Sequence, residues 1–410
     1  MGLWIGRPGY LREFTEAAST FDRSPDLSVF EFQSLAGGVT TWAAPLSPRR
    51  YRLAWSAMLP DDLAHLDRLA RRVDGPGPVA VVDPASGNLL TANHASGTNP
   101  SPGQGAWSAT ANVTRNGTPG SPLMLTLAAP DDLTTLVYYG TTPALAYPVA
   151  QGQPCTFWAP QLAPVADQLR MWCYGSDGAY IRLHYTSRTD RPFTFTMESD
   201  VAYVRPGVKL ARSFNALPVG PALFVQGTPA KAYQLGSRQA FDADQAAGRA
   251  PIKWTVGGTG AALSVSGGNV MVTFPNSGNL NWSPMNGTPG YPVTPGQTAV
   301  FTAAFSGADF VGMDFLSSSG SAVLSVPRQA SVVPAGAAYV APWCVAGKVT
   351  GTVPVGASSL LLWDAPPVDL PAGEGSGLFT VTNYSQSIRP GNLDSRDASI
   401  ELVEVTYAAS

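Results

Sequence analysis

A short block of sequence occurs twice in this chain and decides its fold class. The stretch Tyr147-Pro148-Val149-Ala150-Gln151-Gly152-Gln153 recurs as Tyr291-Pro292-Val293-Thr294-Pro295-Gly296-Gln297. Two further matches follow in the same order, and they pair Ala202-Tyr203-Val204-Arg205-Pro206 with Ala338-Tyr339-Val340-Ala341-Pro342, and Pro218-Val219-Gly220 with Pro354-Val355-Gly356. A repeat of long period in a chain rich in glycine and proline predicts two copies of one β domain.

Composition narrows the classes of protein to which the chain can belong. Its 410 residues include 42 glycines and 37 prolines, and 44% of the residues are hydrophobic, which indicates several ordered all-β domains. Only 13% of the residues are charged and the net charge is −3, which argues against a nucleic-acid partner.

The sequence shows no signal peptide and no apolar run that would cross a membrane. Three cysteines are too few for a metal cage or a disulfide framework, so we expect buried free thiols.

The first 87 residues differ from the rest, because they combine strands with a helix. Residues 50–56 alternate between apolar and polar side chains, which predicts a half-buried strand. Residues 60–73 predict a helix that begins at a proline and carries an apolar stripe of Leu63, Leu66, Leu69 (or Ala70) and Val73. His65 lies beside this stripe and is expected to be a solvated surface residue. We therefore expect a small barrel-like β unit with one α-helix.

From Asn88 onward the sequence predicts only strands and turns. In the first copy, residues 169–174 and 180–185 flank Gly175-Ser176-Asp177-Gly178, which is typical of a β-hairpin. Residues 311–316 correspond to the first strand of this hairpin in the second copy. The matched apolar positions are expected to face the core, and they are Leu169, Met171 and Cys173 in the first copy and Val311, Met313 and Phe315 in the second.

Two alternating segments, residues 378–382 and 400–407, follow residues 360–363, which already supply a closing strand for the second copy. We therefore expect the tail to return to the N-terminal unit. The predicted domains are a β-barrel of residues 1–87 plus 376–410, a first jelly roll of residues 88–250 and a second of residues 251–375. The fold class is mainly β, with one small β-barrel that has one α-helix and two tandem jelly-roll β-sandwich domains.

Several stretches resemble distal tail proteins, the minor tail proteins of long-tailed actinobacterial phages. The resemblance is carried by five segments and a closing strand, namely Arg49–Trp55, Leu59–Leu63, Gly75–Pro78, Val82–Pro84, Asn88–Asn93 and Ser399–Val405. It implies a virion protein that assembles in the bacterial cytoplasm as a hexameric ring below the tail tube. The implied partners are further copies of the chain and the tail tube, tape measure and tail hub or baseplate proteins. The repeated blocks also resemble jelly rolls of carbohydrate-binding modules.

Catalytic chemistry finds little support in the sequence. The three histidines lie far from any nucleophile motif, and the patterns of α/β-hydrolases, zinc proteases and P-loops do not occur. Residues 373–377 are glycine-rich, but no helix follows to cap an anion, so we expect a turn. The expectation is therefore a protein that is not an enzyme and has no cofactor and no metal site.

One surface is a candidate for binding, on the hairpin of the first copy. If Leu169, Met171 and Cys173 face the core, strand alternation turns the residues between them outward. We expect a patch of rings and donors that could stack on sugars and bind their hydroxyl groups, made of Arg170, Trp172, Tyr174, Tyr180, Arg182 and His184. The corresponding face of the second copy, around Gly312 and Asp314, is expected to lack an aromatic platform.

Three interpretations of the whole chain remain open. The first is a structural ring protein of the tail tip, with jelly rolls that contact the baseplate or host-surface glycans. The second is a carbohydrate-binding adhesin whose main role is attachment to the host cell wall. The third is a secreted glycan-active enzyme, against which the missing signal peptide and catalytic unit count. In each case the patch could instead be buried against a neighbouring domain or subunit.

Overall fold

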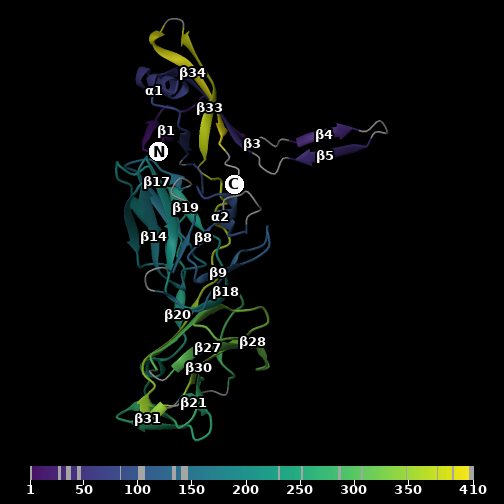
Figure 1. The fold of residues 1–410 in the computed structure, drawn as a ribbon, viewed down its shortest axis with the longest axis vertical. Helices are drawn as coiled ribbons and strands as arrows, with labels where there is room; N and C mark the ends of the chain where they lie inside the picture. The colour runs from purple at the N-terminus through teal and green to yellow at the C-terminus, as the bar shows by residue number, and fades with distance from the viewer. Residues whose placement is uncertain are drawn as a thin grey trace.

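The computed structural model describes residues 2–25, 29–33, 38–43, 48–83, 85–99, 107–131, 135–139, 146–229, 231–250, 253–284, 288–305, 308–347, 349–375, 377–389 and 392–405. The chain is mainly β and extends along one axis (Figure 1). Strands from the two ends of the sequence lie together at one end of this axis, and the two copies of the repeated domain follow one after the other.

The terminal unit is built from both ends of the chain. Its elements are β1 (Leu3–Arg7), β2 (Tyr10–Phe14), β3 (Thr20–Pro25), β4 (Val29–Gln33), β5 (Val39–Ala43), β6 (Arg49–Met58), α1 (Pro60–Ala70), β7 (Val79–Val82), β33 (Leu378–Arg389) and β34 (Asn392–Glu404). Seven of the strands form one sheet in the order β2-β1-β7-β33-β34-β6-β3. The two C-terminal strands therefore lie in its centre, where Phe379 pairs with Val79 and Ile400 pairs with Leu53.

Helix α1 covers this sheet through part of the predicted stripe. Leu66 and Leu69 are buried in the core of the unit, and Leu63 packs against it. Val73 is 59% exposed, which corrects the predicted stripe, because the helix ends at Ala70 and Val73 lies in the following turn. His65 is also not a solvated residue, since its Nε2 lies 3.0 Å from the carbonyl oxygen of Ile5.

We expect Leu66→Asp to leave the terminal unit unfolded or insoluble. Leu66 is fully buried, so the substitution places an uncompensated carboxylate in an apolar core, at a cost on the order of 4 kcal/mol. Urea unfolding and the soluble yield measure the effect. Val73→Asp is the matched control, since Val73 is exposed beyond the same helix and its replacement should change stability little. A soluble, stable monomer of Leu66→Asp would show that α1 is an interface helix.

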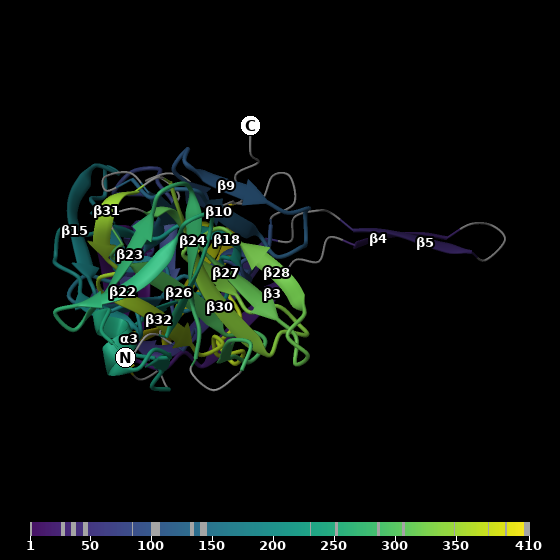
Figure 2. The ribbon, with the colours of Figure 1, turned by 90° about the horizontal axis from the view of Figure 1, so that it is seen from below.

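A two-stranded arm projects from the terminal unit. Strands β4 and β5 pair only with each other among the described residues, and Figure 2 shows the hairpin reaching well beyond the rest of the molecule. Phe32 on β4 is 65% exposed and Val39 on β5 is 59% exposed. Such an isolated hairpin is only marginally stable in water, so the arm is suited to pack against another surface.

The first β-sandwich follows the terminal unit. Its elements are α2 (Ala92–Ser96), β8 (Ser108–Ala109), β9 (Val113–Asn116), β10 (Met124–Leu127), β11 (Leu136–Tyr138), β12 (Tyr147–Pro148), β13 (Pro154–Trp158), β14 (Ala166–Tyr174), β15 (Tyr180–Thr186), β16 (Phe193–Thr196), β17 (Tyr203–Leu210), β18 (Phe214–Pro218) and β19 (Leu223–Gln226). One sheet has the order β15-β14-β17-β11-β8, with β12 also paired to β17. Strands β16-β13-β19 form a second sheet, and β18-β10-β9 belong to a third.

The second β-sandwich repeats this arrangement. Its elements are β20 (Ser237–Gln239), α3 (Ala243–Ala247), β21 (Trp254–Gly257), β22 (Ala262–Ser266), β23 (Asn269–Phe274), β24 (Gly278–Trp282), β25 (Tyr291–Pro292), β26 (Thr298–Ala303), β27 (Ala308–Leu316), β28 (Ala322–Val326), β29 (Ala330–Val332), β30 (Tyr339–Ala346), β31 (Val349–Pro354) and β32 (Ser358–Trp363). The repeated blocks lie at equivalent positions, since Tyr147 pairs with Val204 as Tyr291 pairs with Val340. The predicted duplication is therefore confirmed.

A continuous sheet joins the two sandwiches. Its order is β20-β32-β26-β29-β18-β10-β9, in which β29 of the second copy lies parallel to β18 of the first. Because β20 and α3 contact β32, we propose that the second domain begins near residue 237 and not at 251. We also propose that residues 1–87 and 376–410 form one domain, as the shared sheet suggests.

The remaining expectations concern helices and cysteines. Two helices of one turn, α2 and α3, occur where only strands and turns were expected after Asn88. They are too short to produce an apolar period in the sequence. All three cysteines are buried and free, as predicted. In the described part of the chain, no helix has the length and apolar character needed to cross a membrane.

Candidate carbohydrate-binding site

The predicted hairpin exists, and its first strand has the predicted faces. Strand β14 pairs with β15 around the turn at residues 175–178. Leu169, Met171 and Cys173 are fully buried, so the outer face of β14 carries Arg170, Trp172 and Tyr174. The prediction for this strand is confirmed as far as its core face is concerned.

The register of the hairpin changes the second half of the predicted patch. Cys173 lies opposite Arg182 and Met171 lies opposite His184, and residues directly opposite in an antiparallel pair share a face. Arg182 and His184 therefore project from the inner face, so the predicted patch was wrong for these two residues. A register shift after Cys173 places Tyr180 opposite Tyr174, so Tyr180 stays with the patch.

Arg182 and His184 have structural partners on their own side of the sheet. Arg182 forms ion pairs with Glu198, at 3.2 Å, and with Asp200. The ring of His184 stacks on Phe195 with the ring centres 3.5 Å apart, and its Nε2 lies 3.2 Å from Glu198. The pKa of the Glu198 carboxyl group is lowered overall. Burial raises it, but hydrogen bonds from its own backbone and from His184, together with the positive charge of Arg182, lower it by more.

Neighbouring strands add residues that the sequence analysis missed. Arg205 of β17 lies opposite Trp172, and Tyr203 lies opposite Tyr174. Tyr138 of β11 lies opposite Gly207, which follows Arg205 on the same face of β17. On β15, Tyr185 lies opposite Arg170. We call the resulting surface the aromatic platform, and it consists of Tyr138, Arg170, Trp172, Tyr174, Tyr180, Tyr185, Tyr203 and Arg205.

The sequence did contain a pattern from which two of these additional residues could have been found. Tyr203 and Arg205 alternate with the buried Val204 and Pro206 inside the repeated block. This alternation predicts a face for β17, but it does not show which strand lies beside it. Tyr138 comes from a strand of three residues, for which alternation gives little information.

Trp172 occupies the middle of the platform and depends on a glycine. A carbon atom added at Gly207 in the Cβ position would lie 2.6 Å from Cζ3 of Trp172, so the indole ring lies directly over this residue. The ring centre of Tyr138 lies 4.7 Å from that of Trp172, at an interplanar angle of 53°. The absent side chain at residue 207 therefore allows the Trp172 ring to pack over the sheet.

Exposure differs across the platform. Tyr180 and Tyr185 are each 58% exposed, Trp172 and Tyr138 are half-buried, and Tyr174 is buried. Burial raises the pKa of the Tyr138 and Tyr174 hydroxyl groups, so both remain neutral donors at ordinary pH. Burial likewise lowers the pKa of Arg170, although a guanidinium stays charged under the same conditions.

The second sandwich was expected to lack an aromatic platform, and it presents a smaller version of this surface. Trp343 of β30 lies over Gly312 of β27, because a Cβ at Gly312 would lie 2.5 Å from Cζ2 of Trp343. Phe310 meets the Trp343 ring edge-on with the ring centres 5.8 Å apart. Asp314 accepts hydrogen bonds from Trp343 Nε1, at 2.9 Å, and from Ser325, at 2.6 Å.

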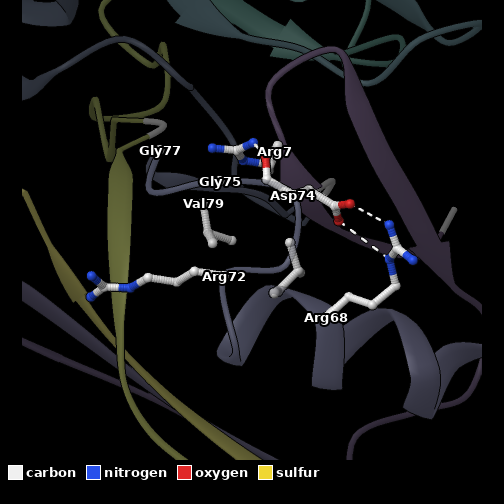
Figure 3. A pocket seen from close by; sticks show the side chains of 8 residues that line it. Arg7, Arg68, Arg72, Asp74, Gly75, Gly77 and Val79 are labelled. Atoms are coloured by element: carbon white, nitrogen blue, oxygen red, sulfur yellow. Dashed lines mark hydrogen bonds and ion pairs between the residues drawn. The ribbon is translucent and has the colours of Figure 1, made fainter.

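A shallow pocket at the end of α1 holds three arginines but is occupied by internal contacts. Figure 3 shows the guanidinium of Arg68 facing the carboxylate of Asp74, with which it forms an ion pair. Arg7 donates a hydrogen bond to the backbone oxygen of Asp74. The side chain of Arg72 points away from these two. These contacts of Asp74 tie the turn after α1 to β1 and to the helix itself. The aromatic platform therefore remains the candidate binding site.

Comparisons with known proteins give no close relative. No protein-family model matches the sequence. No curated protein matches it in sequence. Among solved structures, the chain is similar to the N-terminal CBM22-1-CBM22-2 tandem domain from Paenibacillus barcinonensis Xyn10C, at 10% identity over 76% of this chain and 99% of that one, with a TM-score of 0.18. A similarity of this size does not bear on function.

Proposed function

We propose that this protein is a structural component of a phage tail tip whose first β-sandwich binds carbohydrate on the host surface. The carbohydrate part rests on one observation, the Trp172 ring spread over Gly207 among tyrosines and arginines on an open sheet face. The tail part rests on the sequence resemblance of residues 49–93 and 399–405 to distal tail proteins.

The chemistry of the platform suits sugars. The faces of pyranose rings carry C–H groups that pack on flat aromatic rings, and tyrosine hydroxyl groups and guanidinium groups donate to sugar hydroxyl groups. Tyr180 and Tyr185 are exposed at the edge strand β15, where a glycan chain could reach them. Burial of the same rings against a protein partner is the rival interpretation, since tyrosine and tryptophan are also enriched at protein interfaces.

The terminal unit supports the assembly part of the proposal. Its arm of β4 and β5 leaves Phe32 and Val39 exposed, and a second copy of the chain is the partner that a ring would supply. Six copies is the number that the family resemblance implies. Mass measurement of the purified protein, together with its retention on host cell walls, separates the candidates. A ring that ignores glycans favours a purely structural role, and a monomer that binds walls favours an adhesin.

We expect Trp172→Ala to weaken binding to host cell-wall glycans by about threefold to tenfold, because aromatic stacking contributes about 0.5–1.5 kcal/mol beyond area burial. Titration of wall fragments followed by calorimetry or fluorescence measures the loss. Trp343→Ala is the matched control, since it also removes a tryptophan ring packed on a sheet glycine. Both variants should lose similar stability, and only Trp172→Ala should lose affinity. Equal affinity in Trp172→Ala and the wild type would exclude the platform as the site.

A further inference from the structure

Two arginines of the platform lie against its rings. The guanidinium carbon of Arg205 lies 4.2 Å from the ring centre of Tyr138 and 5.7 Å from those of Trp172 and Tyr174. The guanidinium carbon of Arg170 lies 5.9 Å from the ring centre of Trp172. The tryptophan in the middle of the platform is therefore flanked by two positive charges.

Neither charge is neutralised by an ion pair with a carboxylate among the described residues. The nearby Asp167 pairs with Lys209, at 3.2 Å, and Arg170 donates its Nε hydrogen to Gln168, at 2.8 Å. The Nε of Arg205 is buried and has no hydrogen-bond partner in the described part of the molecule. Stacking uses the flat face of a guanidinium and leaves its edge, with the N–H donors, available to an acceptor.

Three arginines of the terminal unit contrast with these two, because each of them forms an ion pair with a carboxylate. Arg12 pairs with Asp62, Arg23 with Glu374 and Arg49 with Glu404. The chain as a whole is slightly acidic, with a net charge of −3. Two guanidinium groups without a paired carboxylate, beside the rings of the platform, favour a ligand that brings its own negative charge, since hydrogen bonds between charged groups are roughly twice as strong as those between neutral ones.

We propose that the platform recognises an acidic saccharide, one that carries carboxylate or phosphate groups on its sugar units. This inference rests on the proposed carbohydrate-binding function and names its ligand class. A sugar ring stacks on Trp172, and an adjacent anionic group accepts charge-assisted hydrogen bonds from Arg205 and Arg170. The rings favour a saccharide over an acidic peptide, because they offer flat surfaces beside the donors.

The test compares a charged and a neutral probe that have the same sugar rings. Oligogalacturonate and its methyl ester have the same sugar rings, but the ester lacks the carboxylate charge. Binding of both to the full chain is measured by calorimetry, with poly-glutamate as the acidic peptide. The acid form should bind roughly tenfold more tightly than the ester, and added salt should reduce this preference.

Arginine variants assign the preference to the platform. Arg205→Gln and Arg170→Gln should each bring the affinity for the acid form close to that for the ester, while the affinity for the ester changes little. Arg238→Gln in the second sandwich is the control, because Arg238 is exposed and donates only to the backbone oxygen of Pro292 in the described structure. Thermal unfolding of each variant checks that the platform remains folded.

Each other result counts against the acidic ligand. Equal binding of acid and ester by the wild type would overturn the charge preference and leave carbohydrate binding in place. Binding of poly-glutamate that is as tight as that of the acid form, and equally sensitive to Arg205→Gln, would show that the partner is an acidic protein segment. If neither sugar binds and Trp172→Ala leaves wall binding intact, both the ligand class and the proposed carbohydrate-binding function are wrong.

Discussion

A chain that ends after Gly375 is expected to lose the folded terminal unit while it retains both β-sandwiches. The truncation removes β33 and β34, which occupy the centre of the seven-stranded sheet between β7 and β6. It also removes Phe379, Ile400 and Leu402, which are fully buried in the core of the unit. The remaining strands would form two separate groups, β2-β1-β7 and β6-β3, with their apolar faces exposed to water.

Limited proteolysis with mass spectrometry measures this loss. Residues 1–87 should be cleaved early in the truncated chain, while residues 88–363 keep the protection that they have in the full chain. A chain that ends after Val405 keeps both terminal strands and is the matched control. If residues 1–87 stay protected after truncation at Gly375, the terminal strands are not needed for the unit, and the proposal that the two ends form one domain is wrong.

Local patterns in the sequence predicted the elements well. The alternation in residues 50–56 and 169–174 assigned the buried faces of β6 and β14, because each strand has one face in a core. The repeated blocks predicted the two sandwiches, because equivalent turns and strands need equivalent residues. The apolar stripe of α1 was correct for Leu66 and Leu69 and failed only at Val73, beyond the end of the helix.

Relations between strands could not be predicted in the same way. Arg182 and His184 were assigned to the wrong face, because a shift of one residue in register reverses every side chain of a strand. Arg205 and Tyr138 were missed because their neighbours on the sheet come from distant parts of the sequence. The platform therefore depends on the pairing of strands that lie far apart in the sequence.

A buried amide, that of Asn88, lies where the first sandwich meets the segment that returns from the second. Its Nδ2 donates to the backbone oxygens of Ala222, at 2.8 Å, and Pro371, at 3.0 Å. Its Oδ1 accepts from the backbone N–H groups of Leu90, at 3.2 Å, and Phe224, at 3.0 Å. The side chain thus connects the start of the first sandwich, the loop before β19 together with β19 itself, and the segment that returns from the second sandwich.

We expect Asn88→Ala to destabilise the first sandwich by on the order of 4 kcal/mol. The substitution leaves two backbone donors and two acceptors without their partner, in a site from which water is excluded, and each unsatisfied buried group costs about 1–3 kcal/mol. Hydrogen exchange of the Leu90 and Phe224 amides reports the effect directly, since both should lose protection. Urea unfolding of the variant measures its size.

The duplication supplies the control, because Gln239 occupies the equivalent place in the second sandwich. Its Oε1 accepts from the backbone N–H groups of Phe241, at 3.3 Å, and Leu360, at 2.9 Å. Gln239 is exposed, so water can replace its side chain, and Gln239→Ala should cost only about 1 kcal/mol. If the two variants lose similar stability, the buried amide of Asn88 does not hold the return segment, which must be fixed by other contacts, such as those of Glu374 with Arg23 and Ser86.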